Sequence, residues 1–129
     1  MEPQFLSLDE VLEIHQQQIE LYGGAPGLRD PAALESAVAT PQATFGGEFL
    51  HPSVPAMAAA YLFHLANNHP FVDGNKRTDL GAALVFLDLN GYTVDDESEA
   101  LADLVIDVIV NRRDKAWIAE ELRRGARRR

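Results

Sequence analysis

Two apolar segments at the centre of the chain constrain its fold most. Residues 55–68 are rich in alanine and other apolar side chains, and a second apolar run extends from Ala82 to Leu89. Apolar segments of this length are typical of helices that are buried in a domain core. The sequence therefore predicts a buried helix over residues 55–68 and another over residues 75–89, joined by a short polar loop.

The loop between these helices concentrates reactive side chains. Its sequence is His69-Pro70-Phe71-Val72-Asp73-Gly74-Asn75-Lys76-Arg77-Thr78. Because Pro70 disfavours helical geometry at the residue before it, the first helix is predicted to stop at His69. Phe71 is expected to anchor the loop in the core. The start of the next helix offers unpaired N–H groups and the positive end of a dipole, so the loop is predicted to hold phosphate.

The polar residues of the loop suit that prediction. Asp73 is a hard oxygen ligand that fits Mg²⁺ held jointly with substrate phosphates. Gly74 allows a ligand to approach the backbone closely, and Asn75 can donate to a phosphate oxygen. Lys76 supplies a point charge and Arg77 a bidentate fork for phosphates.

Of the four histidines in the chain, His69 is the candidate general base, because its ordinary pKa lies near neutrality and phosphate-handling groups flank it. His15 and His64 lie at helical positions and are interpreted as core or surface residues. His51 lies in a loop with no partner in reach by sequence. The spacing of His64 and His69 does not match the usual helical zinc pattern.

At these residues the chain resembles a known family, the Fic/Doc (Fido) proteins. The run His-Pro-Phe-Val-Asp-Gly-Asn-Lys-Arg is similar to the family signature, and Asn-Lys-Arg in place of Asn-Gly-Arg resembles its Doc (death-on-curing) toxin branch. Residues 8–15, 22–30 and 34–37 also resemble the amino-terminal half of Doc. The resemblance implies an all-α fold: a compact single-domain helical bundle over residues 1–129, with a short flap loop or hairpin.

The resemblance further implies the toxin of a type II toxin–antitoxin system. With Mg²⁺ and ATP as co-substrate it would transfer a phosphoryl group to a hydroxyl of a target protein, with a translation elongation factor as the expected target. His69, Asp73 and Arg77 would be catalytic, with His69 deprotonating the hydroxyl and Asp73 holding the metal. The nucleotide would be bound by four consecutive residues: Gly74, Asn75, Lys76 and Arg77.

Two alternatives remain open. Lys76 occupies the position that Fic enzymes leave open for the α-phosphate, and AMP transfer is the alternative to phosphoryl transfer. The chain also has Asn67 where Doc-like chains often carry arginine, and a second arginine expected near Leu80 or Gly81 is missing. The second alternative is therefore a catalytically weak module that acts by binding a partner.

The resemblance also assigns a role to residues 43–51, which correspond to the flap that grips the target segment. Thr44, Phe45, Gly46 and Gly47 would bind an extended peptide by adding it to the edge of a strand. A plain connecting loop is the alternative interpretation. Residues 93–98 are the nearest match to a built-in inhibitory motif, but they are interpreted as an ordinary helix start.

Composition agrees with a cytoplasmic protein. The net charge of −9 argues against broad nucleic-acid binding and against binding to an anionic membrane. There is no cysteine and no apolar span of membrane length. The expected partner is a small antitoxin that folds on binding and presents an acid near Arg77. Residues 123–129, with five arginines, are predicted to be a frayed basic tail.

Local signals predict the remaining elements. Ser7 and Glu10 form a capping box that opens a helix ending near Tyr22. The other predicted elements are a helix over residues 31–39, a short strand or hairpin near residues 44–50, an extended piece at 92–94, and helices over residues 98–111 and 115–123. The buried face of the first helix is expected to contain Leu8, Val11, Leu12, Ile19 and Tyr22.

Overall fold

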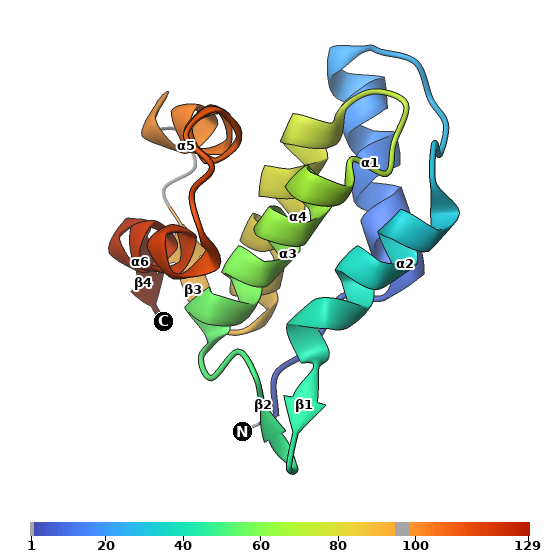
Figure 1. Ribbon diagram of the computed structural model, residues 1–129. Coiled ribbons are helices and arrows are strands. Elements are labelled where there is room, and N and C mark those ends of the chain that lie inside the picture. The colour runs from blue at the N-terminus through green and yellow to red at the C-terminus, as the bar shows by residue number, and fades with distance from the viewer. Residues whose placement is uncertain (1, 95–98) are drawn as a thin grey trace.

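The computed structural model of the chain describes residues 2–94 and 99–129 (Figure 1). Helices dominate the described residues, and the strands are only two or three residues long. The prediction of an all-α bundle is confirmed. The elements in chain order are α1 (Leu8–Tyr22), α2 (Pro31–Ala39), the 3₁₀ turn η1 (Thr40–Gln42), β1 (Thr44–Phe45), β2 (Glu48–Phe49), α3 (Val54–Asn68), α4 (Asn75–Leu89), β3 (Tyr92–Val94), α5 (Glu99–Val110), α6 (Lys115–Gly125) and β4 (Ala126–Arg128).

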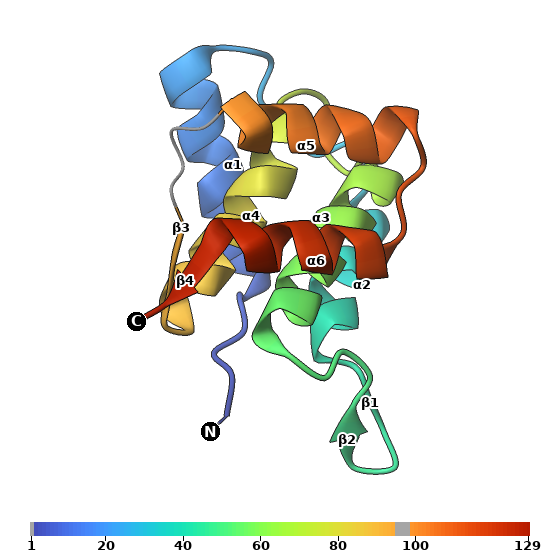
Figure 2. The same cartoon turned by 90° about the vertical axis from the view of Figure 1, so that its left-hand side faces the viewer.

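Helix α3 is the centre of the core, as its apolar sequence predicted. It packs against α4 and α6 most extensively and also contacts α2 (Figures 1 and 2). Its alanines at 58, 59 and 60 are fully buried and keep the neighbouring helices close, while Tyr61 and Leu65 fill the remaining space. The Tyr61 hydroxyl accepts a hydrogen bond from the N–H of Leu6, so its polar atom is paired inside the core.

The helix boundaries follow from local capping. Ser7 and Glu10 form the predicted capping box at the start of α1. Asp30 caps α2, Ser53 caps α3 and Asp114 caps α6, each by accepting a backbone N–H three residues further on. The predicted helices therefore begin within one residue of their observed starts, apart from the helix predicted from residue 98. That start, like residues 95–97, lies outside the described part of the chain.

The predicted buried face of α1 was wrong at one end. Tyr22 is the last residue of the helix and is 62% exposed. The buried residues of α1 are instead Val11, Ile14, His15 and Ile19. Tyr22 lies beyond the edge of the core, where the Arg77 guanidinium stacks 4.6 Å from its ring centroid.

The prediction of a frayed tail over residues 123–129 was also wrong. The structure does not show a frayed tail: Ala126–Arg128 pairs with Tyr92–Val94 as an antiparallel ribbon. The Arg129 guanidinium then donates hydrogen bonds to the carbonyl oxygens of Asp88 and Tyr92. The partner strand follows α4, more than thirty residues earlier in the chain, so the tail sequence alone carried no signal for this pairing.

The predicted hairpin near residues 44–50 is confirmed. Thr44 pairs with Phe49 and Phe45 with Glu48, and Gly46 and Gly47 both have positive φ, as a tight two-residue turn requires. The hairpin projects from the end of the bundle where α3 begins (Figure 2). Among the described residues, no helix is both long and apolar enough to cross a membrane.

Candidate active site

The loop between α3 and α4 begins with a strained backbone turn. Helix α3 stops at Asn68, as predicted, and His69 adopts the left-handed conformation with φ 45°. A non-glycine residue rarely takes this conformation, because its Cβ crowds the backbone. The turn places the His69 side chain at the surface, with its Nε2 atom 3.3 Å from the amide nitrogen of Asn75.

Arg29 holds this turn in place. Its Nε atom donates to the His69 carbonyl oxygen at 2.7 Å, and its Nη2 atom donates to the Asn68 carbonyl oxygen at 2.9 Å. These carbonyls belong to the end of α3, where the last C=O groups lack partners within the helix and favour a cation. Arg29 was not among the predicted site residues, because it precedes the loop by about forty positions.

The segment that joins α1 to α2 lines the loop along one edge (Figure 1). Leu28 and Phe71 form an isolated antiparallel bridge, and the Val72 N–H donates to the Gly27 carbonyl oxygen at 3.0 Å. The Ala25 N–H donates to Oδ2 of Asp73 at 3.1 Å. This segment therefore supports the loop from outside, although it was not among the predicted site residues.

Two positions in the site have no room for a larger side chain. A Cβ atom on Gly24 would lie 2.8 Å from Oδ2 of Asp73, and one on Gly74 would lie 3.1 Å from Cδ1 of Ile19. Both glycines also have positive φ. Gly24 therefore lets the α1–α2 segment approach the Asp73 carboxylate, and Gly74 lets the backbone of the loop approach α1.

Asp73 is an exposed carboxylate whose charge is favoured by its surroundings. Hydrogen bonds from the N–H groups of Ala25 and Gly74 lower its pKa below the ordinary value, and the nearby Arg77 adds to this effect. The group therefore stays ionised over a wider acidic range than a free aspartate. The ionised carboxylate is an oxygen ligand that fits Mg²⁺ shared with phosphates, and the open helix start and two cationic residues beside it suit the phosphates.

The described residues contain no group of three or more histidine, cysteine or acidic side chains that could hold a metal ion alone. A metal at Asp73 would therefore need further oxygen ligands from a substrate or from water. Mg²⁺ is commonly held in this way, by one or two carboxylates together with substrate phosphates.

His15 is the second supporting residue that the sequence did not indicate. Its ring lies parallel to that of Phe71, with centroids 3.8 Å apart, and its Nε2 atom lies 2.8 Å from the Asp73 carbonyl oxygen. Since that carbonyl can only accept, Nε2 must carry the proton. Of the two interpretations left open for His15, core or surface, the structure selects the core, and it adds that His15 fixes the backbone of Asp73.

Asn75 is buried, and its side chain faces inward. Its Oδ1 atom accepts from the Phe71 N–H at 3.1 Å, and its Nδ2 atom donates to the Phe71 carbonyl oxygen at 2.8 Å. The predicted donation from this amide to a phosphate would therefore compete with bonds that shape the loop. The amide also faces Nε2 of His69, which favours the tautomer with an accepting lone pair at Nε2.

The remaining predicted residues meet in one pocket of about 490 Å³. Helix α4 has glycine as its N-cap, and no side chain caps its first turn. Its first backbone N–H groups therefore face the pocket as candidate anion donors. The cationic side chains are exposed at the same place. The lining residues are His69, Val72, Asp73, Gly74, Asn75, Lys76 and Arg77.

The structure does not bring the predicted flap to this pocket. Thr44, Phe45, Gly46 and Gly47 lie where α3 begins, whereas His69 follows its last residue (Figure 1). Fifteen helical residues separate the two ends, a length of about 20 Å. The segment that pairs edge to edge with the loop is Gly27–Arg29 instead.

Just after the pocket, α4 buries an acid. Asp79 is 1% exposed, and neither of its carboxylate oxygens has a hydrogen-bond partner among the described residues. Burial raises the pKa of this carboxyl well above its ordinary value, so the neutral form is favoured in the folded protein.

The chain is a helical bundle with a loop that suits phosphate at the start of a helix. Comparison with known proteins identifies the class of protein to which this fold and this site belong. Residues 5–87 match the Fic/DOC family, and the chain belongs to that family. It is 37% identical over 119 residues to "Protein kinase doc" of Escherichia phage P1, covering 92% of this chain and 93% of that protein. It is 43% identical over 103 residues to "Toxin Doc" of Mycolicibacterium smegmatis, covering 78% and 79%.

Proposed function

We propose that the chain is a toxin that transfers the γ-phosphoryl group of ATP to a hydroxyl of a target protein. One observation carries this proposal: a single pocket combines an exposed histidine, an ionised carboxylate, two cations and an uncapped helix start. The names of the two relatives, a protein kinase and a toxin, support the same reading of the pocket.

In the proposed reaction, Nε2 of His69 accepts the proton of the target hydroxyl as its oxygen attacks the γ-phosphorus. The bond from the γ-phosphorus to the bridging oxygen breaks, and ADP leaves with that electron pair. Nε2 is the suitable acceptor because the Asn75 amide nitrogen, which only donates, faces it and favours the tautomer with a lone pair there. The weak 3.3 Å contact to Asn75 is one that a hydroxyl could displace.

The proposed reaction also requires positive charge where the phosphates of ATP would bind. Lys76 and Arg77 are exposed beside the first N–H groups of α4, and together these groups suit the oxygens of a phosphate chain. Arg77 is oriented by its stacking on Tyr22. Asp73 would hold Mg²⁺, which when bound offsets the negative charge that develops between the phosphates.

The proposed target is a translation elongation factor, and the proposed partner is a small antitoxin. Growth of a host would stop if its elongation factor were modified, so a free toxin requires an inhibitor. We propose that a segment of the antitoxin folds on the toxin and places an acid near Arg77. Expression of the chain alone should stop growth, and co-expression with the adjacent small open reading frame should restore it.

The same pocket leaves AMP transfer as a second candidate. Lys76 is the residue proposed to select between the two, since its side chain fills space at the phosphates. In Lys76→Gly, any remaining activity should shift towards AMP transfer. If this variant still transferred only the γ-phosphoryl group, Lys76 would not select the chemistry.

Mass spectrometry of purified elongation factor tests the proposal. After incubation with the chain, Mg²⁺ and ATP, the target should carry phosphate on one hydroxyl, and the His69→Ala variant should leave it unmodified. A target that carries AMP would favour the second candidate. An unmodified target, with growth arrest still observed, would favour a module that acts by binding a partner.

A further inference from the structure

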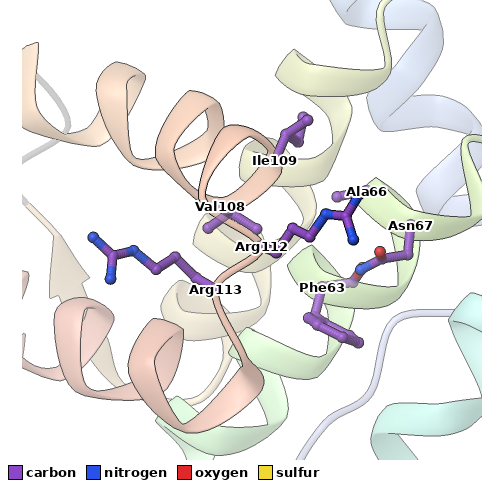
Figure 3. Close-up of a pocket in the computed structure, with 7 residues that line it drawn as sticks. All are labelled: Phe63, Ala66, Asn67, Val108, Ile109, Arg112 and Arg113. Carbon is purple, nitrogen blue, oxygen red and sulfur yellow. The ribbon is translucent and has the colours of Figure 1, made fainter.

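A second pocket, of about 460 Å³, lies between α3 and α5 (Figure 3). It shares no lining residue with the candidate active site. Its volume lies within the range of small-molecule sites, and its walls combine apolar side chains with a few polar groups. The lining residues are Phe63, Ala66, Asn67, Val108, Ile109, Arg112 and Arg113.

Arg112 has an unusual backbone for its residue type. Its φ is 51°, in the left-handed region, and it follows the end of α5. The N–H of Arg113 donates to the Val108 carbonyl oxygen at 3.2 Å, which is the 6→1 bond of a Schellman motif. Glycine is the usual residue at the left-handed position of that motif. Arginine there costs backbone free energy, which favours a function for its side chain.

The Arg112 guanidinium is free to bind a ligand. Among residues 2–94 and 99–129, no hydrogen bond or ion pair engages it. Arg113, its neighbour, is engaged by comparison: it pairs with Asp107 at 3.1 Å and lies 4.4 Å from the Trp117 ring centroid. Figure 3 shows Arg112 extending towards Ala66 and Asn67, whereas Arg113 points away from them.

The remaining walls suit a planar apolar group. Phe63 presents a half-buried ring, and Val108 and Ile109 form an aliphatic wall from α5. The Asn67 amide donates to the Phe63 carbonyl oxygen through Nδ2, which leaves its Oδ1 atom as an acceptor for a ligand. A ring, an aliphatic wall and one amide are the features by which proteins bind heterocyclic bases.

We propose that this pocket binds an aromatic organic phosphate of the kind represented by a nucleoside monophosphate. The phosphate pairs with the Arg112 guanidinium, which offers a planar set of donors. The ring lies against Phe63, and Asn67 contacts its polar edge. Because the rest of the chain is acidic, with a net charge of −9, an anion is attracted only where such cations are exposed.

Residue-resolved NMR with AMP as the probe tests the proposal, since it separates this pocket from the candidate active site. AMP should shift the backbone amides of Asn67, Val108, Ile109 and Arg112 in a saturable way. Adenosine lacks the charge and inorganic phosphate lacks the ring, so each should bind there at least tenfold more weakly than AMP. Shifts confined to residues 74–77 would overturn the proposal.

The Arg112→Gly variant distinguishes an effect on ligand binding from an effect on folding, because the two should change in opposite directions. Glycine relieves the left-handed strain, so the variant should melt about 2–4 °C higher and still bind AMP in this pocket at least tenfold more weakly. Arg128→Gln, which removes one exposed cation from β4, is the matched control and should bind AMP normally. Unchanged AMP affinity in Arg112→Gly, or an acidic peptide binding there more tightly than AMP, would contradict the proposal.

Discussion

The ends of α3 and α5 make the same kind of turn but are supported in different ways. Each ends near a left-handed residue that is not glycine, His69 with φ 45° and Arg112 with φ 51°. At His69, Arg29 binds two successive carbonyl oxygens from a segment forty residues away in sequence. At Arg112, the turn is closed locally, by the bond from Arg113 to Val108.

The two turns show two ways in which a protein can keep a strained backbone conformation. Strain persists where the surrounding structure determines the conformation by more contacts than the turn itself supplies. The turn at His69 is fixed by tertiary contacts, as a group that must meet a substrate within a fraction of an ångström requires. The turn at Arg112 needs only a local cap, and it leaves an exposed cationic side chain at the surface.

The largest predicted effect concerns the His69 turn. His69→Ala removes the candidate base but not the contacts of Arg29, which involve only backbone oxygens at this turn. Turnover on the target protein should fall about 10²–10⁴-fold while the melting temperature changes little. Transfer at the original rate by a folded variant would remove His69 from the mechanism.

Arg29→Lys weakens the support and leaves every proposed catalytic group in place. Lysine cannot reproduce the planar pair of bonds to the Asn68 and His69 carbonyl oxygens. We expect turnover to fall about 10–100-fold, because the base loses its fixed position. The His69 amide should also become more mobile in NMR relaxation. If turnover is unchanged, the local backbone alone holds the turn, and the contrast with Arg112 is lost.

Asp79, in α4 just after the loop, lowers the stability of the protein in addition to the strained turn at His69. The raised pKa means that the folded protein holds a proton that unfolding releases at neutral pH, so stability should fall as the pH rises above about 4. Asp79→Asn keeps the shape of the neutral acid. It should stabilise the protein by about 1–3 kcal/mol at pH 8 and by less at pH 5. Equal effects at both pH values would contradict the assignment.

The contacts of Lys115 with two histidines should make the stability of the protein depend on pH in the opposite direction. Lys115, the first residue of α6, donates from Nζ to Nε2 of both His51 and His64 at 3.1 Å. It lies 64 residues after His51, which is why no partner of His51 was in reach by sequence. Burial, and then the ammonium of Lys115, lowers the pKa of His64 to about 4, and the same two causes lower the pKa of His51.

Both shifts favour the neutral imidazole in the folded protein. The stability that this arrangement contributes is complete above pH 6.5 and is lost as the pH falls towards 4. We expect a loss of about 1–2 kcal/mol after allowing for solvent screening, measured by urea unfolding. The acid-induced loss should be smaller in Lys115→Met, and an unchanged loss there would exclude the ammonium as a cause.

The smallest predicted effect concerns the turn at Arg112 and tests how it differs from the turn at His69. Arg112→Gly should stabilise the protein by about 0.5–1 kcal/mol, since the local cap accepts glycine without other changes. The same substitution at His69 removes the candidate base, so transfer should fall about 10²–10⁴-fold, as in His69→Ala. If Arg112→Gly is instead destabilising, the arginine side chain supports the fold, and its turn resembles that of His69 more closely than the contacts suggest.

Features with local causes were predictable from the sequence. The starts of α1, α2 and α6 follow from capping side chains within three residues, and the end of α3 follows from Pro70. The content of the loop was visible for the same reason, because residues 69–77 are consecutive. These signals need no knowledge of the tertiary fold.

The support around the loop depends on packing and could not be predicted in this way. His15 precedes Asp73 by 58 residues and Ala25 precedes it by 48, yet both contact it. Nothing in their local sequence distinguishes them from a core histidine and a turn alanine. The cluster of glycines at 23, 24 and 27 was the available signal, because closely spaced glycines often mark segments that approach one another.

Titration of the chain with Mg²⁺–ATP, followed by NMR at each backbone amide, tests whether the loop between α3 and α4 binds the phosphates. We expect saturable shifts that are largest at Gly74, Asn75, Lys76 and Arg77, that require Mg²⁺, and that weaken strongly in Asp73→Asn. Binding that is independent of both Mg²⁺ and Asp73, or shifts that avoid residues 74–77, would contradict the assignment of this loop as the phosphate site.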